Sequence, residues 1–428
     1  MKNLLRASLA SILALFSRAI LRKYQPQIIM ITGSVGKTST KDAVIAAFST
    51  YTQVRGSEKS FNSELGVPLT IIGVGNPWEN VSKWMGVFLK GFLLLIRKQS
   101  YPKVMVLEVG ADRPGDLEKI LRFATPDAVV VTRLPDVPVH VEAYASTQAV
   151  KDEEFTPAFA LATGAPLILA SDNEYALSMG KKTQARMYTF GFQEGSDVLI
   201  VAPSIMVEKG VVVGMEACVM VEGKSFPLVV TGALGTHHLL APASAIACAR
   251  SLGVPLPKIL LGLARYTPPA GRSRILRGIH RSIIIDDTYN SSPVAVSEAL
   301  NSLALMPTLG RRIAVLGDML ELGRYSMAEH EAVGTQAAGI VDLLVCVGVR
   351  SRATGEKALQ AGLTSEQVIF YSDSLETAKE LPIRITGEDV ILVKGSQGIR
   401  MERVAEVLLE NKEDATLLVR QEKEWKRR

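Results

Sequence analysis

The sequence is poor in cysteine, with three residues among 428, and these lie far from one another. Cys218, Cys248 and Cys346 form no Cys-x-x-Cys pair, which argues against a disulfide framework and a structural zinc site. A large excess of charge of one sign is also missing, because 48 Lys and Arg residues face 43 Asp and Glu residues for a net charge of +5. This balance gives no reason to expect nucleic acid as a partner, and the scarcity of cysteine suits a reducing, cytoplasmic setting.

No apolar run is long enough to cross a bilayer, which takes about 20 residues. Between Arg6 and Arg18 lie eleven mostly apolar residues, and the apolar stretch 85–96 is interrupted by Lys90. Near the N-terminus, apolar residues recur at helical spacing beside basic ones, so residues 1–27 are expected to form a basic amphipathic helix. We expect both segments to pack or to lie at an interface, with peripheral contact to the inner face of the membrane through the N-terminus.

The most informative stretch of the chain starts at Ile28. A β-branched apolar run stops at a glycine-rich turn, Thr32-Gly33-Ser34-Val35-Gly36-Lys37-Thr38-Ser39-Thr40, and a helix-like stretch follows. This order forms an anion site, because backbone N–H groups and the positive end of the helix face one point. Lys37 would reach the outer phosphates of a nucleotide, and the Thr38 hydroxyl would bind Mg²⁺. Ile31 stands where the usual phosphate-loop pattern has its first glycine, so we predict a nucleoside triphosphate site of a shorter form.

Strands and helices alternate along most of the chain. Strands expected at 104–107, 127–131 and 167–170 end at polar residues, which is typical of a parallel α/β sheet. Short alternating runs between 187 and 230 predict a small antiparallel region. Further strands are expected at 282–285, 313–316, 343–347, 368–371 and 390–393. The expected fold is α/β: a central P-loop parallel-sheet ATPase domain (28–271) that includes the antiparallel region, then a Rossmann-like C-terminal domain (272–428).

Seven motifs occur in a fixed order along the chain. They are Thr32–Thr40, Asn62–Pro68, Glu108–Ala111, His140–Glu142, Asp286–Pro293, Leu316–Gly323 and Val393–Ser396. The first four resemble the central domain of the Mur ligase family. The last three resemble the C-terminal domain of its MurF-like branch, which adds D-alanyl-D-alanine to UDP-N-acetylmuramoyl-tripeptide. The resemblance implies ATP-dependent formation of an amide (peptide) bond through an acyl phosphate, in the synthesis of peptidoglycan precursors.

The resemblance also implies roles for individual residues. Lys37 would bind the outer phosphates, Thr38 and Glu108 would hold Mg²⁺, and His140 would hold a second metal ion near the acyl phosphate. Further contacts with ATP are implied for Gly33, Ser34, Gly36, Ser39, Asn62, Arg272, Tyr289 and Asn290. Contacts with the incoming amine substrate are implied for Lys394 and Ser396. For Asp286 and Asp287, capping of a turn and contact with a substrate stay open.

The chain departs from the family at two further positions, Glu154 and His238. Relatives carry a lysine about fourteen residues after the histidine, carbamylated so that its end is a carboxylate; here that position is Glu154, with Lys151 one helical turn earlier. Glu154 could supply the carboxylate directly, Lys151 could be carbamylated after a small shift, or both could lie on a solvated helix face. We favour Glu154 because it needs no shift of register. His238 replaces an asparagine that contacts adenine in relatives, which leaves the contact with the base open.

Fewer than thirty residues precede the strand before the phosphate loop, too few for the UDP-binding domain found there in MurF-like enzymes. We therefore expect that domain to be lacking, so the identity of the acceptor stays open. The leading hypothesis is an ATP- and Mg²⁺-dependent ligase that adds D-Ala-D-Ala to UDP-N-acetylmuramoyl-tripeptide. One alternative is a Mur-like ligase that uses a different carboxylate, and another is a non-catalytic nucleotide-binding scaffold.

Overall fold

The computed structural model describes residues 2–57, 60–77 and 80–426, apart from the side chains of residues 2–7 and of Val81. The chain divides into two compact units. The first unit contains Met1–Val201, Cys218–Leu228 and Leu240–Tyr266, and the second contains Ala202–Ala217, Val229–Leu239 and Thr267–Arg428. These units are defined by the packing of residues against one another and not by function. The domain bounds expected from the sequence therefore stay a prediction.

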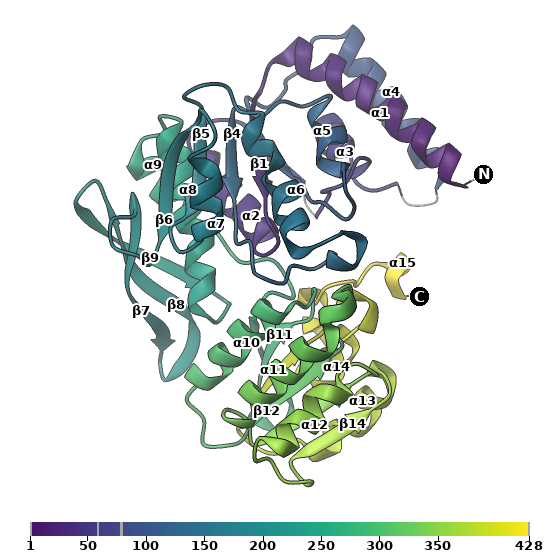
Figure 1. The fold of residues 1–428 in the computed structure, drawn as a ribbon, viewed down its shortest axis with the longest axis vertical. Coiled ribbons are helices and arrows are strands. Elements are labelled where there is room, and N and C mark those ends of the chain that lie inside the picture. The colour runs from purple at the N-terminus through teal and green to yellow at the C-terminus, as the bar shows by residue number, and fades with distance from the viewer. Residues whose placement is uncertain (1, 58–59, 78–79, 427–428) are drawn as a thin grey trace. The chain divides into compact units, whose positions relative to one another are not determined.

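The larger sheet has the strand order β2-β3-β1-β4-β5-β6-β7-β8-β9 (Figure 1). Its first six strands are β2 (Val54–Gly56), β3 (Val104–Glu108), β1 (Gln27–Thr32), β4 (Ala128–Val131), β5 (Pro166–Ala170) and β6 (Arg186–Gly191). All pairings among these six strands are parallel. Ile31 of β1 pairs with Glu108 on one side and with Val130 on the other, so the residues that follow these strands meet at one carboxyl edge.

Two hairpins complete this sheet. Strands β7 (Val198–Glu208), β8 (Val211–Val221) and β9 (Lys224–Thr231) are joined by two-residue turns. Both residues of each turn have positive φ, with Lys209 at 49° and Gly210 at 80° in the first turn. That geometry belongs to the type I′ turn, which connects antiparallel neighbours. The expected antiparallel region and the expected parallel sheet are both present.

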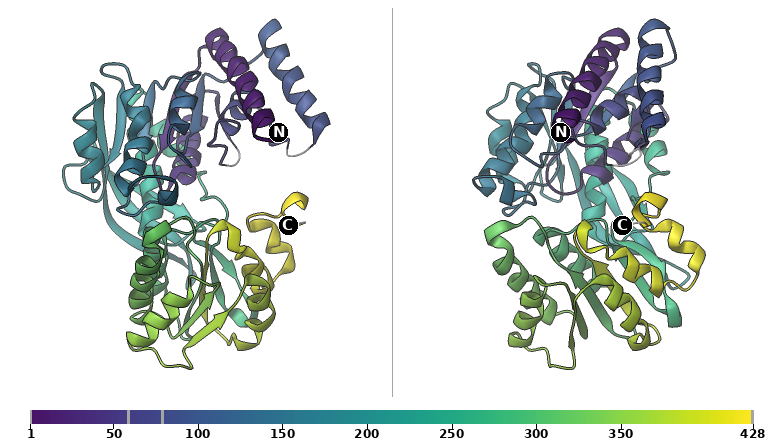
Figure 2. Two further views of the ribbon diagram at one scale, coloured as in Figure 1. Left: turned by 45° about the vertical axis from the view of Figure 1, so that its right-hand side comes forward. Right: turned by 90° about the vertical axis from the view of Figure 1, so that its right-hand side faces the viewer.

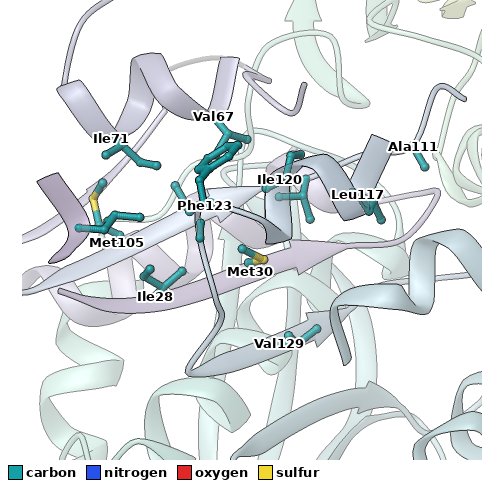
Figure 3. Packing of buried hydrophobic residues seen from close by; sticks show 14 of the residues in the cluster. Ile28, Met30, Val67, Ile71, Met105, Ala111, Leu117, Ile120, Phe123 and Val129 are labelled. Carbon is teal, nitrogen blue, oxygen red and sulfur yellow. The ribbon is translucent and has the colours of Figure 1, made fainter. Parts of the chain in front are cut away.

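Helices pack on both faces of this sheet in the first unit. One face is covered by α2 (Lys37–Ser49), α8 (Leu240–Ser251) and α9 (Leu256–Leu263), which contact one another. The other face is covered by helices that include α3 (Gly66–Ile72), α5 (Asp116–Leu121), α6 (Thr147–Phe159) and α7 (Glu174–Gly180). On that side Ile28 and Met30 of β1 join Met105 of β3, Val67 of α3 and Phe123 in one buried apolar cluster (Figure 3). Alternate residues of the strand thus face opposite helix layers, as a strand buried on both faces requires.

The second unit is built on a six-stranded sheet with the order β10-β11-β15-β12-β13-β14. Its strands are β10 (Arg274–Arg277), β11 (Ile283–Asp287), β12 (Arg312–Gly317), β13 (Leu343–Val347), β14 (Val368–Tyr371) and β15 (Val390–Lys394). Between them run α10 (Pro293–Leu305), α11 (Ser326–Ala338), α12 (Arg352–Gln360), α13 (Ser374–Glu380) and α14 (Glu402–Leu408). In the described part of the chain, the β10–β11 pairing of this sheet is antiparallel and its other pairings are parallel. The expected α/β fold class, with a mostly parallel large sheet and a second α/β unit, is confirmed.

Two long helices lie side by side at one end of the first unit (Figure 2). They are α1 (Lys2–Tyr24) and α4 (Val81–Ile96). Leu13 and Ile20 of α1 are fully buried in the same cluster as Met30, so α1 packs on the body of the unit. The helix expected over residues 1–27 is present from Lys2, and residue 1 lies outside the described part of the chain. Within the described residues, no helix has the length and apolar character needed to cross a membrane.

Candidate nucleotide site

The turn after β1 holds two glycines in conformations that other residues rarely adopt. Gly33 has a φ of 115°, and Gly36, the residue before α2, has a φ of 90°. A Cβ atom on Gly33 would lie 3.0 Å from the backbone nitrogen of Thr132 and closer still to its Oγ1, so no larger residue fits without movement. The first N–H groups of α2, from Lys37 onward, have no acceptor within the helix. Turn and helix together therefore make an anion site at the carboxyl edge of the sheet.

Lys37 folds back over this turn. Its Nζ donates a hydrogen bond to the carbonyl oxygen of Gly33 and lies 3.8 Å from Oε1 of Glu154. The ammonium group is therefore held directly above the turn, where the phosphates of a nucleotide would lie.

The next residue, Thr38, faces a buried carboxylate. Its Oγ1 lies 3.1 Å from Oε1 of Glu108, to which it donates a hydrogen bond, and 2.8 Å from Oγ of Ser60. Glu108 is 2% exposed, and within the described residues its Oε2 has no hydrogen-bond partner. A buried carboxylate oxygen without a donor is costly unless a cation completes it, so Thr38 and Glu108 fit a Mg²⁺ ion.

Glu154 reaches the phosphate loop from α6. Its Oε2 accepts a hydrogen bond of 2.5 Å from Oγ of Ser34, and its backbone oxygen accepts one of 2.6 Å from Oγ1 of Thr32. Burial raises the pKa of this carboxyl above its usual value, while Lys37, Ser34 and His140 act in the opposite direction. The carboxylate thus lies in the site, beside both the lysine and the loop.

Lys151 points elsewhere. Its Nζ donates a hydrogen bond of 3.0 Å to Oδ1 of Asp136 and lies 5.6 Å from the centroid of the Tyr175 ring. Of the two residues considered for the extra carboxylate, only Glu154 contacts the phosphate loop.

His140 begins a short 3₁₀ helix (Val141–Ala143) with a φ of 67°. Its Nε2 lies 3.6 Å from Oδ1 of Asp112, which is largely exposed. Across the part of the chain that the structure describes, no three His, Cys, Asp or Glu residues are grouped as a metal site would require. An imidazole is a poor ligand for Mg²⁺, which prefers oxygen. The role of His140 as a ligand of a second metal therefore stays a prediction.

Asn62 contacts the segment after β3 through a backbone hydrogen bond. Its carbonyl oxygen accepts a hydrogen bond of 3.1 Å from the N–H of Gly110, two residues after Glu108. A Cβ atom on Gly110 would lie 2.8 Å from Nδ2 of Asn62, so the two segments touch. Asn62 therefore lies beside the strand end that carries Glu108.

The second unit holds the remaining predicted residues. Nζ of Lys394 lies 2.7 Å from Oδ2 of Asp287 and donates a hydrogen bond of 2.9 Å to the carbonyl oxygen of Asn290. Both side chains of the ion pair are buried, and burial lowers the pKa of Lys394. Asp286 caps the turn instead, since its Oδ1 accepts hydrogen bonds from N and Oγ1 of Thr288 at 3.2 and 2.6 Å.

Ser396 and Asn290 help to order the end of β15. Oγ of Ser396 accepts a hydrogen bond of 2.8 Å from the N–H of Leu320. Oδ1 of Asn290 accepts a long one, 3.4 Å, from the N–H of Gln397. These contacts join three of the motifs recognised in the sequence at the carboxyl edge of the second sheet.

A cationic and aromatic group lies near the start of the second sheet. The guanidinium of Arg272 lies 4.3 Å from the centroid of the Tyr289 ring. His238 is buried, and its Nε2 has no hydrogen-bond partner among the described residues. Burial, with the neighbouring His237 and Arg272, lowers the pKa of His238 well below its usual value, so the ring is neutral. Contact of His238 with the nucleotide base stays a prediction, because this nitrogen is buried.

Sequence reasoning missed Lys41, one helical turn after Lys37. Its side chain is fully buried, and its Nζ donates a hydrogen bond of 2.6 Å to the carbonyl oxygen of Ser57 and lies 3.1 Å from Oδ1 of Asp42. It fixes the backbone at Ser57. The spacing of four residues from Lys37 on one helix was the available signal.

Comparison with known families agrees with this geometry. Residues 89–249 match the family model of the Mur ligase middle domain, and residues 271–397 match the Mur ligase, glutamate ligase domain. The chain belongs to the Mur ligase family. The two matched regions take in Glu108, His140 and Glu154 in the first case and Asp287 and Lys394 in the second.

Curated relatives of this Mur ligase match along most of its length. The UDP-N-acetylmuramoyl-tripeptide--D-alanyl-D-alanine ligase of Bacillus subtilis is 24% identical over 396 residues, which cover 92% of this chain and 78% of the relative. The enzyme of the same name from Escherichia coli is 27% identical over 389 residues, covering 90% and 77%.

Solved structures show the same fold. The MurF ligase from Thermotoga maritima in complex with ADP has a TM-score of 0.75 at 23% identity and covers 95% of this chain and 84% of its own. A MurF from Acinetobacter baumannii has a TM-score of 0.76 at 21% identity, with 94% and 81% covered. At these identities the likeness establishes the fold alone.

Proposed function

We propose that this Mur ligase is an ATP-dependent enzyme of peptidoglycan precursor synthesis that adds D-Ala-D-Ala to UDP-N-acetylmuramoyl-tripeptide. The observation that carries the proposal is a phosphate loop in which Lys37 folds over the turn and Thr38 contacts the buried Glu108. The curated relatives that match about nine-tenths of this chain are named for that activity. A scaffold protein would have no need of a buried carboxylate left open beside the loop.

The reaction has two steps. A carboxylate oxygen of the acceptor attacks the γ-phosphorus of ATP, the bond to the bridging oxygen breaks, and ADP leaves from an acyl phosphate. The amine nitrogen of D-Ala-D-Ala then attacks the acyl carbon, and inorganic phosphate leaves as the amide forms. Such transfer depends mainly on positioning and on neutralising charge, which suits a site without a protein nucleophile.

The residues of the first unit divide this work. Lys37 and the first N–H groups of α2 would bind the outer phosphates, and the turn residues Gly33, Ser34, Gly36 and Ser39 would shape the loop around them. Thr38 and Glu108 would hold Mg²⁺, which neutralises phosphate oxygens when bound. We propose that Glu154 takes the place of a carbamylated lysine and orients Lys37 and Ser34 from its buried position.

The residues of the second unit would contact ATP and the amine substrate. Arg272, Tyr289 and Asn290 are proposed to contact the nucleotide, and Asp287, Lys394 and Ser396 the incoming amine. Because Asp287 and Lys394 pair with each other, they would act on substrate as one unit or by holding Asn290 in place.

Small molecules are the proposed substrates, and the cytoplasm is the proposed location because ATP is present there. We also propose peripheral contact with the inner face of the membrane. Neither proposal affects the chemistry of the site.

The test is ADP release from the purified chain with ATP and Mg²⁺, across a panel of carboxylate acceptors, with and without D-Ala-D-Ala. Release is expected only when UDP-N-acetylmuramoyl-tripeptide and D-Ala-D-Ala are both present. Lys37→Ala should lower it at least about 10²-fold, the loss typical of removing one charge-stabilising group. Stimulation by another acceptor or amine would replace the substrate assignment. Absence of release with every acceptor would favour a non-catalytic scaffold.

A further inference from the structure

Helix α4 exposes a continuous row of large apolar side chains. Met85, Leu89, Phe92 and Ile96 are 69%, 59%, 51% and 57% exposed. Their spacing of four, three and four residues places them on one side of the helix. Such a row, on a helix of 16 residues, is larger than the isolated apolar residues found on ordinary protein surfaces.

The opposite side of α4 is firmly packed, so the exposed row is not the result of a loose helix. Val87 and Leu94 are buried, and the ring of Phe16 on α1 lies against Phe88 with ring centroids 6.3 Å apart. Nζ of Lys23 donates hydrogen bonds to the last carbonyl oxygens of α4, at 2.9 Å for Leu94 and 2.8 Å for Leu95. Helix α1 thus holds α4 with its apolar row facing away from the core.

The charged side chains of α1 and α4 have one sign. The sequence contains no Asp or Glu from residue 1 to 41, which includes α1, or from residue 80 to 107, which includes α4. Exposed basic side chains occur on both helices or directly after them: Arg18, Arg22, Lys83, Arg97 and Lys98. Two neighbouring helices that carry an exposed apolar row and exposed basic groups, but no acidic group, are complementary in composition to an anionic lipid surface.

We propose that the exposed row of α4, Met85, Leu89, Phe92 and Ile96, docks in the plane of an anionic bilayer, with the basic residues of α1 and α4 at the headgroups. A helix of this length extends about 24 Å, long enough to lie along the interface but shorter than a bilayer span. A second copy of the chain is a less suitable cover, because a symmetric dimer through this face would bring two basic surfaces together.

The test uses the full chain and vesicles, without nucleotide or substrate, so that its outcome is independent of the ligase reaction. Vesicles of phosphatidylcholine with phosphatidylglycerol are compared with phosphatidylcholine alone in a sedimentation assay at low and high salt. The wild type should bind the anionic vesicles at least about tenfold more tightly than the neutral ones, and less tightly at high salt.

The variants locate the contact. Leu89→Gln with Phe92→Gln should weaken binding to anionic vesicles by about 10–100-fold, since two large apolar groups no longer enter the interface. Leu261→Gln is the matched control, because Leu261 is 52% exposed on α9 of the same unit, and its binding should equal that of the wild type. Circular dichroism confirms that each variant is folded.

Two outcomes would overturn the proposal. One is a wild type that fails to bind anionic vesicles, or binds them as the double variant does. The other is a wild-type dimer in light scattering that the double variant converts to monomer while neither binds vesicles, which would assign the row to self-association.

Discussion

Glu154→Gln should make the protein more stable and less active, and the structure gives the reason for both. The carboxyl is 2% exposed, and burial raises its pKa although Lys37, Ser34 and His140 favour the charged form. At the observed 3.8 Å, attraction to Lys37 is worth about 4 kcal/mol at an effective dielectric constant of about 20. A raised pKa means that desolvation, several kcal/mol per buried ion, exceeds this gain. Ionised Glu154 therefore lowers the stability of the fold, by about 1–3 kcal/mol on the scale of a buried polar group only partly compensated.

The direction of the pKa shift of Glu154 determines the pH range over which stability changes. Because the pKa of Glu154 is higher in the folded state than the value of about 4.3 in an unfolded chain, the fold binds more protons. Wild-type stability should fall as pH rises from about 4.3 through the raised pKa, and Glu154→Gln should lack this fall. The amide oxygen can still accept the hydrogen bond from Ser34. The difference in free energy of unfolding between Glu154→Gln and the wild type should thus be near zero at low pH, where Glu154 is protonated. It should reach its full value above the pKa of Glu154 in the folded state.

The assay pairs urea unfolding between pH 4.5 and 8 with ADP release at pH 8. Turnover of Glu154→Gln should fall about 10²–10³-fold if the carboxylate orients the loop for phosphoryl transfer. Glu153→Gln is the neighbouring control. The carboxylate of Glu153 accepts hydrogen bonds from N–H of Gly115 and Leu117, at 3.1 and 3.0 Å, so its loss should reduce stability without the same pH profile. A Glu154→Gln protein with wild-type turnover, or one less stable at pH 8 than at pH 4.5 relative to the wild type, would refute the reasoning.

Two further predictions concern the second unit. Burial raises the pKa of Asp286 to about 6 despite its hydrogen bonds from Thr288, so the stability that this carboxyl contributes below about pH 3.9 should be lost as pH rises through about 6. Asp286→Asn should remove the part of this loss that falls between pH 4.5 and 7.5, about 2 kcal/mol, as measured by urea unfolding at these two pH values. Equal pH profiles of the wild type and the variant would count against it. Lys394→Met leaves the buried Asp287 without its partner at 2.7 Å and should lower the free energy of unfolding in urea by about 3–5 kcal/mol. Lys151→Met is the control: its partner Asp136 is largely exposed, so the same measurement should show a loss of less than about 1 kcal/mol.

Most of the strands were predictable because they are short runs of apolar residues bounded by polar or glycine residues. Residues 343–347 and 368–371, for example, were expected and observed as strands within these bounds. The antiparallel strand β10 (Arg274–Arg277) was not expected, since two apolar residues between two arginines are too few to stand out from a loop. Turn chemistry was readable for the same local reason, as in Gly33 and Gly36.

Contacts between distant segments were only partly predictable. The spacing from His140 led to Glu154, and the structure places that residue against Ser34, 120 positions away in the chain. Nothing local distinguishes it from Lys151, because which face of α6 meets the phosphate loop is decided by packing of the sheet. The pairing of Asp287 with Lys394 was equally hidden, since it depends on β11 and β15 being neighbours.

The packing of α1 has a geometric consequence for the nucleotide site. Leu13 and Ile20 of α1 share one buried cluster with Ile28 and Met30 of β1, and the phosphate loop begins directly after β1. Since α1 also contacts α4, the exposed apolar row and the phosphate loop belong to the same compact unit. Docking of α4 on a bilayer would therefore fix the height of the phosphate loop above the lipid and its tilt relative to the membrane plane, while rotation about the membrane normal stays free.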